Sequence, residues 1–212
     1  MMRTPTLLAL PLAALLVPSP QGRTFEAWTF VDQQNAYTVT ADTQVFHGGA
    51  LSAHVAALSP ATTASMIVSQ ALRADSWRGK RVRFSAWLRT KDVQKSAGFG
   101  GVLFMRAEGG GSTLASYSTG NRPAGGTTDW TKYQIVLDVP EHAVGITLGF
   151  GMKGPGDLWI DDAALEAVGP DVPVSRAAVK APPLSPSKLR QQQAAYAKRP
   201  TQPLNMDFER VK

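Results

Sequence analysis

Cysteine is absent from the 212 residues of this chain, which excludes disulfide bonds, a cysteine nucleophile and a thiolate metal site. Long hydrophobic runs are scarce as well: the run from Leu7 to Val17 is shorter than the ~20 residues of a membrane-spanning helix. Helical spacing of apolar residues is also rare. In contrast, 19 Gly, 15 Pro and abundant Thr and Val favour an all-β domain with many turns.

Residues 1–22 are typical of a secretory signal peptide. Arg3 precedes the apolar run from Leu7 to Val17, and a segment rich in Pro, Ser and Gly follows it. No small-x-small pattern marks a cleavage site after Val17. We therefore expect a secreted or periplasmic protein without a membrane span, and the lack of cysteine excludes a lipidated cysteine anchor.

The formal net charge of +6 is concentrated at the C-terminal end. Up to Val168 the chain has fourteen Lys and Arg against thirteen Asp and Glu, whereas residues 169–212 have eight against three. The main domain is thus nearly neutral, which argues against nucleic acid as a partner. The basic tail is either a solvated linker or a contact for an anionic surface or a protein partner.

Blocks of alternating apolar and polar residues predict an antiparallel sheet with one buried face. In the block near residue 135, Tyr133, Ile135, Leu137 and Val139 fall on one face, as the period of two in a strand requires. Similar blocks recur every ~8 to 15 residues and predict eight to ten strands, with no helix between them. Residues 23–168 are therefore predicted to form an antiparallel β-sandwich, most simply a jelly roll.

Residues 169–212 are predicted to be a Pro-rich basic tail. The stretch 169–189 lacks periodicity and is typical of an extended linker. SPSKLRQQQAAYAKR, which begins at Ser185, could form one short helix. The last ten residues, PLNMDFERVK, begin like a strand. Of two interpretations, an unpaired remnant is favoured over a strand that returns to the sandwich, because Leu204, Met206 and Phe208 offer only a modest apolar face.

Several motifs that suggest catalysis or phosphate binding lack the necessary context. GFGMKG (149–154) satisfies G-x-G-x-x-G, but a strand rather than a helix N-terminus follows it. The three histidines are far apart, with no metal-type spacing and no G-x-S-x-G elbow. Asp161 and Asp162 are adjacent on a strand and should point to opposite faces, unlike the carboxylate pair of a glycosidase. We therefore expect no enzyme activity.

Three blocks resemble the carbohydrate-binding modules and related galactose-binding-like jelly rolls of secreted bacterial proteins. The first is WRGKRVRFSAWLRTKDV, the second is GTTDWTKYQIVLDV and the third ends in LWIDDAALEAV. HGGALSAHV, from His47, resembles an element of their early strands. The similarity extends over about residues 25–168. It implies the fold, and it leaves the ligand open because one scaffold serves many functions.

The strand parity of Asp161 with Ala163 and Leu165 predicts an inward carboxylate, which needs a partner or a cation. In similar modules this aspartate, a glutamate of the first strand and nearby backbone carbonyls hold a structural calcium. Carried over, the resemblance implies Glu26 and Asp161 as ligands, with carbonyls near residues 47–52; calcium prefers such oxygen ligands. The alternative is that Asp161 accepts backbone N–H bonds without a metal.

Exposed aromatic rings stack on sugar rings while polar groups bind hydroxyls. Trp87 lies on the polar face of its predicted strand with Arg83 and Arg89, and Tyr117 is a candidate neighbour. The sequence thus predicts a non-catalytic module that binds carbohydrate or a similar polyol through these residues. A structural or protein-interaction module without a small ligand is the main alternative, and a subunit of a larger enzyme is a third.

Overall fold

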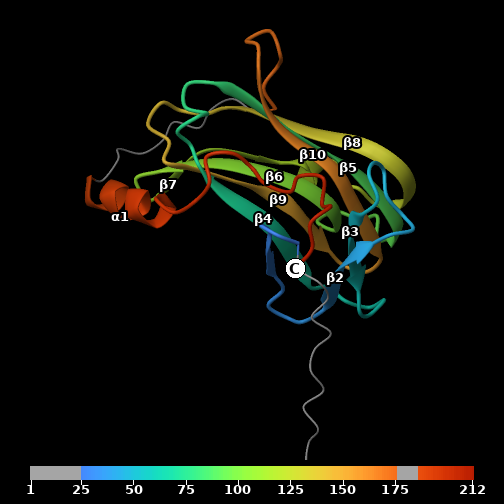
Figure 1. The fold of residues 1–212 in the computed structure, drawn as a ribbon. Helices are drawn as coiled ribbons and strands as arrows, with labels where there is room; N and C mark the ends of the chain where they lie inside the picture. The colour runs from blue at the N-terminus through green and yellow to red at the C-terminus, as the bar shows by residue number, and fades with distance from the viewer. Residues whose placement is uncertain (1–24, 176–185) are drawn as a thin grey trace, which may run out of the picture.

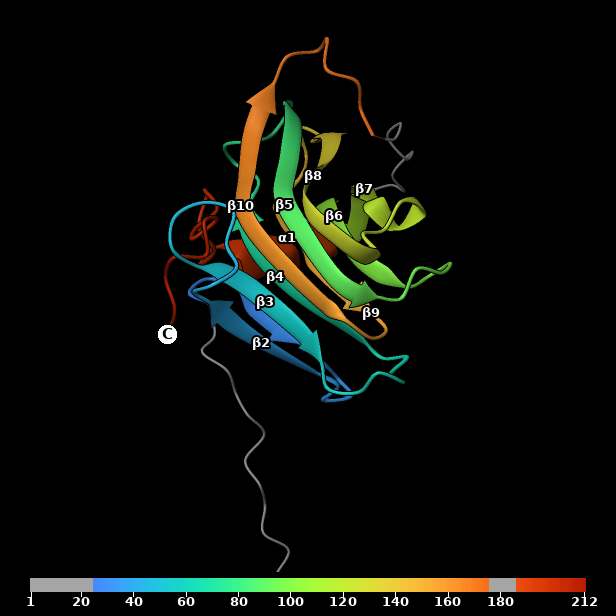
Figure 2. The same ribbon diagram turned by 90° about the vertical axis from the view of Figure 1, so that its right-hand side faces the viewer.

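The computed structural model describes residues 25–175 and 186–212, in which ten strands form two stacked sheets (Figure 1). Sheet 1 has the strand order β1 (Thr29–Val31), β4 (Ser65–Arg73), β9 (Gly145–Lys153), β6 (Gly100–Gly109), β7 (Ser112–Ser118). Sheet 2 has the order β2 (Tyr37–Asp42), β3 (Ser52–Ala57), β10 (Asp157–Val168), β5 (Arg81–Val93), β8 (Gly126–Asp138) and faces the viewer in Figure 2. All strand pairs are antiparallel.

The core lies between the two sheets and consists of the apolar residues that alternate along their strands. On β5 the inward residues Val82, Phe84, Ala86 and Leu88 are fully buried, and on β9 Ile146, Leu148 and Phe150 meet them from sheet 1. The outward positions of the same strands carry polar residues or glycine. The predicted antiparallel jelly-roll sandwich is therefore confirmed.

A bulge in β10 changes the parity that the sequence suggested for Asp161. Ile160 pairs with Leu88 on the inner face and Asp161 pairs with Trp87, so Asp161 belongs to the opposite face. The register then shifts between Asp161 and Ala164, and Asp162 has a φ of 44°. The prediction that Asp161 shares a face with Ala163 is wrong because the bulge adds a residue between them.

The C-terminal segment packs on the sandwich, contrary to our expectation of an unpaired remnant. Phe208 is 0% exposed, and its ring lies 5.1 Å from that of Trp28 and 5.4 Å from that of Phe25. Val211 forms a bridge with Phe25. Polar bonds, which a count of apolar residues overlooks, help to hold the segment: the Asn205 side chain donates to the carbonyls of Glu26 and Arg210.

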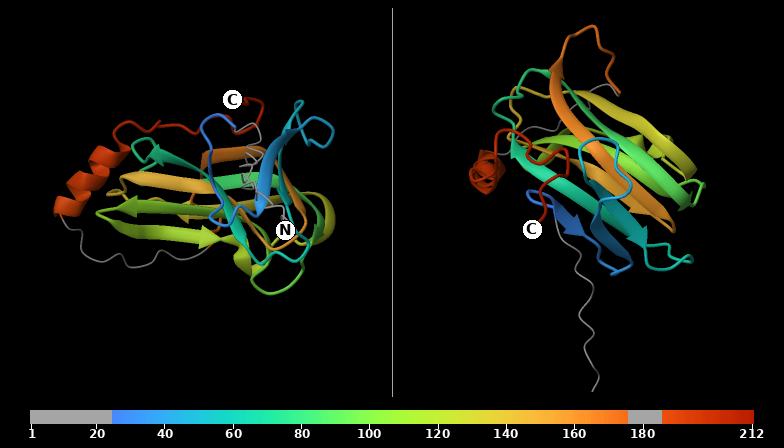
Figure 3. Two further views of the ribbon diagram at one scale, coloured as in Figure 1. Left: turned by 90° about the horizontal axis from the view of Figure 1, so that it is seen from below. Right: turned by 45° about the vertical axis from the view of Figure 1, so that its right-hand side comes forward.

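Helix α1 (Pro186–Tyr196) precedes this segment and lies at one end of the strands of sheet 1 (Figure 3, left). In the described part of the chain, no helix has the length and apolar character that a bilayer crossing requires. The predicted signal peptide, residues 1–22, lies outside the described residues, as does part of the predicted linker.

We expect Phe208→Ala to lower the free energy of unfolding by about 3 to 5 kcal/mol, because it removes a fully buried ring from an aromatic cluster. Leu204→Ala is the matched control, since Leu204 lies in the same segment and is 40% exposed. Urea denaturation of the two variants measures both effects. Equal stability of the two variants would mean that the C-terminal segment does not dock.

Candidate functional site

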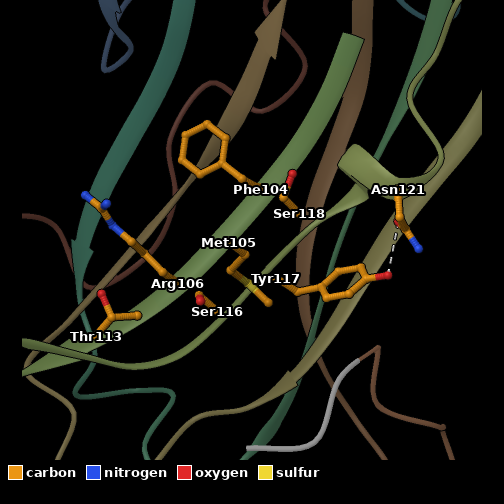
Figure 4. A pocket seen from close by; sticks show the side chains of 8 residues that line it. All are labelled: Phe104, Met105, Arg106, Thr113, Ser116, Tyr117, Ser118 and Asn121. Carbon is orange, nitrogen blue, oxygen red and sulfur yellow. Dashed lines mark hydrogen bonds between the residues drawn. The ribbon is translucent and has the colours of Figure 1, made fainter. Parts of the chain in front are cut away.

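A cavity of about 730 Å³ follows the β6–β7 ladder at the edge of sheet 1 (Figure 4). Its lining combines one arginine, one amide, three hydroxyl side chains, two aromatic rings and a methionine: Arg106, Asn121, Thr113, Ser116, Ser118, Phe104, Tyr117 and Met105. Such a mixture of apolar and hydrogen-bonding groups is typical of a small-molecule site.

The register of β6 decides which of these side chains face outward. Phe104 pairs with Ser118 and Arg106 pairs with Ser116, so these four residues share the outer face. Met105 pairs with Tyr117 on the core side. In Figure 4, Phe104 and Arg106 project to one side of β6, whereas the Tyr117 ring reaches toward Asn121. The Tyr117 hydroxyl donates to the Asn121 side-chain oxygen at 3.3 Å.

A second cavity of about 240 Å³ adjoins the first, because Phe104 and Ser118 line both. Its lining also includes Val102, Ile67, Phe99 and Lys153, and Lys153 Nζ lies 5.1 Å from the centre of the Phe99 ring. We call the two cavities together the groove; its outer-face residues on β6 and β7 are Gly100, Val102, Phe104, Arg106, Ser116 and Ser118.

Gly151 of β9 lines the second cavity of the groove. Gly149 and Gly151 pair with Phe104 and Val102, and a Cβ at Gly149 would overlap the backbone oxygen of Val68. Gly149 thus allows the neighbouring strand and the Phe104 ring to approach β9 closely. The Phe104 ring lies over Gly149, within 3.0 Å of the position of such a Cβ.

Arg106 lines the first cavity and brings a positive charge to it, and its guanidinium forms an ion pair with Glu108. Arg106 Nε lies 2.5 Å from Glu108 Oε1, and Tyr196 Oη, from helix α1, donates to Glu108 Oε2 at 2.6 Å. Burial, together with the hydrogen bond to Glu108, raises the pKa of Tyr196 to about 12. Tyr196 therefore stays a neutral donor at physiological pH, and Glu108 has a partner on each oxygen.

The structure separates the predicted sugar contacts into two groups. Tyr117 lies on β7 of sheet 1, whereas Trp87, Arg83 and Arg89 lie on β5 of sheet 2. The expected neighbourhood of Trp87 and Tyr117 is therefore wrong, because the shared polar pattern of two strands does not tell which sheet each strand joins. Arg83 pairs with Glu166 at 2.9 Å, and Arg89 lines a 240 Å³ cavity beside Trp159.

Trp87 belongs to an aromatic cluster on sheet 2. His47 stacks on Trp87 with ring centres 4.1 Å apart, and the Trp130 ring meets His47 edge-on at 5.7 Å. The His47 Nδ1 atom lies 2.6 Å from Asp162 Oδ2. Because His47 covers one ring face, Trp87 offers a smaller stacking surface than its outward position suggested. Its role as a ligand contact stays a prediction.

The predicted calcium ligands Asp161 and Glu26 each have partners within the chain. The buried Asp161 carboxylate accepts hydrogen bonds from three amides, those of His47, Gly48 and Asp162. Burial raises the pKa of Asp161, although these amides act in the opposite direction. Glu26 is exposed and lies 3.7 Å from Arg210. Among the described residues, no group of three or more His, Cys, Asp or Glu side chains is arranged to bind a metal.

Glu209, from the C-terminal segment, holds the same loop from the other side. Its Oε1 atom accepts hydrogen bonds from the amides of Ala50 at 2.7 Å and Leu51 at 3.0 Å. Two carboxylates thus bind four amides of residues 47–51. Asp161 accepts the backbone N–H bonds that the alternative required, and calcium binding stays a prediction.

Sequence reasoning missed Phe104, Arg106 and Asn121. Alternation in FGGVLFMRAEG does place Phe104 and Arg106 on one face, so this signal was available. The contribution of Tyr196 had no local signal, since it comes from a helix about ninety residues further along the chain.

The sequence matches no family model. It is 40% identical over 105 residues to YbfP of Bacillus subtilis (strain 168), an uncharacterized HTH-type transcriptional regulator. The matched residues are 49% of this chain and 34% of that protein, so the likeness extends over only about a third of this curated relative.

Solved structures with a similar fold include a phage enzyme domain and a carbohydrate-binding module. The enzymatically active domain of bacteriophage CBA120 tailspike protein 4 is 17% identical with a TM-score of 0.53, covering 69% of this chain and 20% of that one. TmCBM61, solved with β-1,4-galactotriose, is 16% identical with a TM-score of 0.45, covering 68% and 90%. Carbohydrate-binding modules are thus among the structural neighbours, as the resemblance implied, and at these identities the likeness concerns the fold alone.

We expect chelation of divalent cations to leave the melting temperature unchanged, because the loop amides are already bound by Asp161 and Glu209. Thermal unfolding with EDTA and with added calcium measures this, and Glu209→Gln should lower the melting temperature under both conditions. A melting temperature that rises with calcium and falls with EDTA would support the predicted calcium site and contradict this expectation.

Proposed function

We propose that this chain is a non-catalytic module that binds carbohydrate or a similar polyol in the groove of sheet 1. The observation that carries the proposal is the lining of the 730 Å³ cavity, where hydroxyls, Arg106 and Asn121 surround an outward phenylalanine. The jelly-roll fold is compatible with this function, which must be argued from the site itself.

The groove offers both kinds of contact that a sugar ring requires. The outward face of Phe104 is partly exposed and can pack on the apolar face of a pyranose. Ser116, Ser118 and Asn121 supply donors and acceptors for hydroxyl groups. The Arg106 side chain is 49% exposed and keeps donors that its Nε bond to Glu108 does not use. Together these groups favour an uncharged polyhydroxylated ligand.

The carboxylates near the groove favour binding over hydrolysis. A glycosidase needs two carboxyl groups across the scissile bond, one of them able to donate a proton. Glu108 is the acidic residue beside Arg106, and both of its oxygens are bonded to neighbours of the chain. Because both oxygens already have partners within the chain, our proposal includes no reaction.

A protein-binding role is the second candidate, and an apolar surface on sheet 1 favours it. Val31 and Ile67 are paired across β1 and β4 and are each 45% exposed. Exposed apolar patches often mark contact surfaces. The basic tail, with exposed Lys198 and Arg199, would add a contact for an acidic protein.

We expect a glycan array to identify a ligand for the full chain, and we expect Arg106→Ala and Phe104→Ala each to weaken its binding at least about tenfold, the loss of one good contact. Titration calorimetry measures the affinities. Trp87→Ala is the comparison on sheet 2: an unchanged affinity assigns the ligand to the groove. A loss of glycan affinity in Trp87→Ala alone would assign the site to the aromatic cluster of sheet 2. A protein that binds no glycan on the array would favour the protein-binding role.

We further propose that the module acts outside the cytoplasm after loss of residues 1–22, on the basis of Arg3 and the apolar run to Val17. Intact-mass measurement on protein from the native host should give a chain shorter by about 22 residues in the extracytoplasmic fraction. Retention of Met1 or Met2 in a cytoplasmic protein would contradict export.

A further inference from the structure

Helix α1 rests on sheet 1 without a buried apolar face of its own. None of its side chains is fully buried, and Tyr196 is half-buried. Its contacts with sheet 1 and the β6–β7 turn include Gln192, whose Oε1 accepts the Gly111 amide at 3.0 Å, and Tyr196 at its last residue. These two contacts help to place a helix that has no buried apolar face.

Tyr196 is fitted to a gap in the sheet. A Cβ at Gly145 would overlap the Tyr196 ring, so the missing side chain at this position makes the space that the ring fills. The Tyr196 hydroxyl is bonded to Glu108 at 2.6 Å and lies 3.4 Å from Thr147 Oγ1. Gly145 and Thr147 are outward positions of β9, the strand whose outward Gly151 lines the second cavity.

The order of the outward residues on β6 places Tyr196 one outward position beyond Arg106, the last residue of β6 that lines the groove. From the second cavity, this order is Val102, Phe104, Arg106 and then Glu108, which pairs with Gly145 under Tyr196. At the opposite end, the groove reaches Gly98, Phe99 and Lys153, and the exposed Gly98 and Lys153 leave that end open.

We propose that Tyr196 closes one end of the groove, so that the site takes the end of a glycan chain rather than its interior. An interior segment must leave a groove at both ends, and the Tyr196 ring with helix α1 blocks one exit. The inference rests on the proposed function. Through Glu108, Tyr196 also fixes Arg106, so the residue that closes the groove orients the cation nearest the closed end.

The experiment measures the amount of protein bound at saturation per mass of polysaccharide, before and after partial acid hydrolysis of that polysaccharide. Halving the mean chain length doubles the number of ends per mass and leaves the amount of interior almost unchanged. The probes are xylan and β-1,4-galactan, with xylohexaose and β-1,4-galactotriose as their short counterparts. We expect the binding capacity of the full chain, per mass of whichever polymer binds, to double when the chain length is halved.

Two variants test the part of Tyr196. Gly145→Ala places a methyl group where the ring lies, at a residue without a positive φ, so the sheet can accept it while the ring must move. We expect its capacity to rise severalfold and to lose its dependence on chain length. Tyr196→Phe keeps the ring and loses the hydroxyl, and we expect it to retain that dependence with a weaker affinity.

Alkaline spectrophotometric titration checks the variants independently of any ligand. The tyrosine that titrates near pH 12 should be absent from Tyr196→Phe and should titrate nearer pH 10 in Gly145→Ala. Two results would overturn the inference and leave the proposed binding function intact. The first is a wild-type binding capacity that does not change with the chain length of the polysaccharide. The second is a Gly145→Ala variant whose capacity still doubles when the chain length is halved, although its Tyr196 ring has moved. A wild type that binds none of these glycans, nor any other on the array, defeats the proposed function and with it this inference.

Discussion

The burial of Phe208 is the contact on which the position of the C-terminal segment, and of the loop that it holds, depends. It brings the C-terminal segment against Phe25 and Trp28, close to the start of the described chain, and Phe150 of β9 completes the cluster at 5.9 Å. With Phe208 in place, Glu209 reaches the amides of residues 50 and 51. Asp161 binds the neighbouring amides from β10, so two carboxylates and one aromatic cluster fix the loop that carries His47.

Glycine on one strand shapes the candidate site as much as the residues that line it. The outward positions of β9 are mostly glycine, and each of these glycines has a different neighbour: Tyr196 fills the space at Gly145, Phe104 leans over Gly149, and the Met66 carbonyl lies close to Gly151, with Val102 and Ile67 beside it. A sheet face with large side chains on this strand would be flat or convex here. The groove thus arises from missing side chains on β9 and from rings supplied by β6 and α1.

The sandwich could be predicted from the sequence because alternation repeats in every long strand and because turn residues separate the strands. The site could not be predicted to the same degree, for two physical reasons. A bulge at Asp161 reverses the parity on which its orientation was judged. In addition, alternation tells which face a side chain takes but not which sheet its strand joins, so Tyr117 and Trp87 were grouped together across two sheets. The docking of PLNMDFERVK was missed because its hydrogen bonds, to Gln70 and to the amides at residues 50 and 51, come from distant parts of the chain.

The pairing of Phe25 with Val211 has a consequence for how the molecule comes into being. Residues at nearly opposite ends of the described chain must meet before the aromatic cluster is complete, so this contact has a very large sequence separation. A ribosome makes the chain from its N-terminus, and until Phe208 emerges the rings of Phe25, Trp28 and Phe150 lack this part of their cover. The cluster can therefore be completed only after Phe208 has been made, when all ten of the described strands are already present.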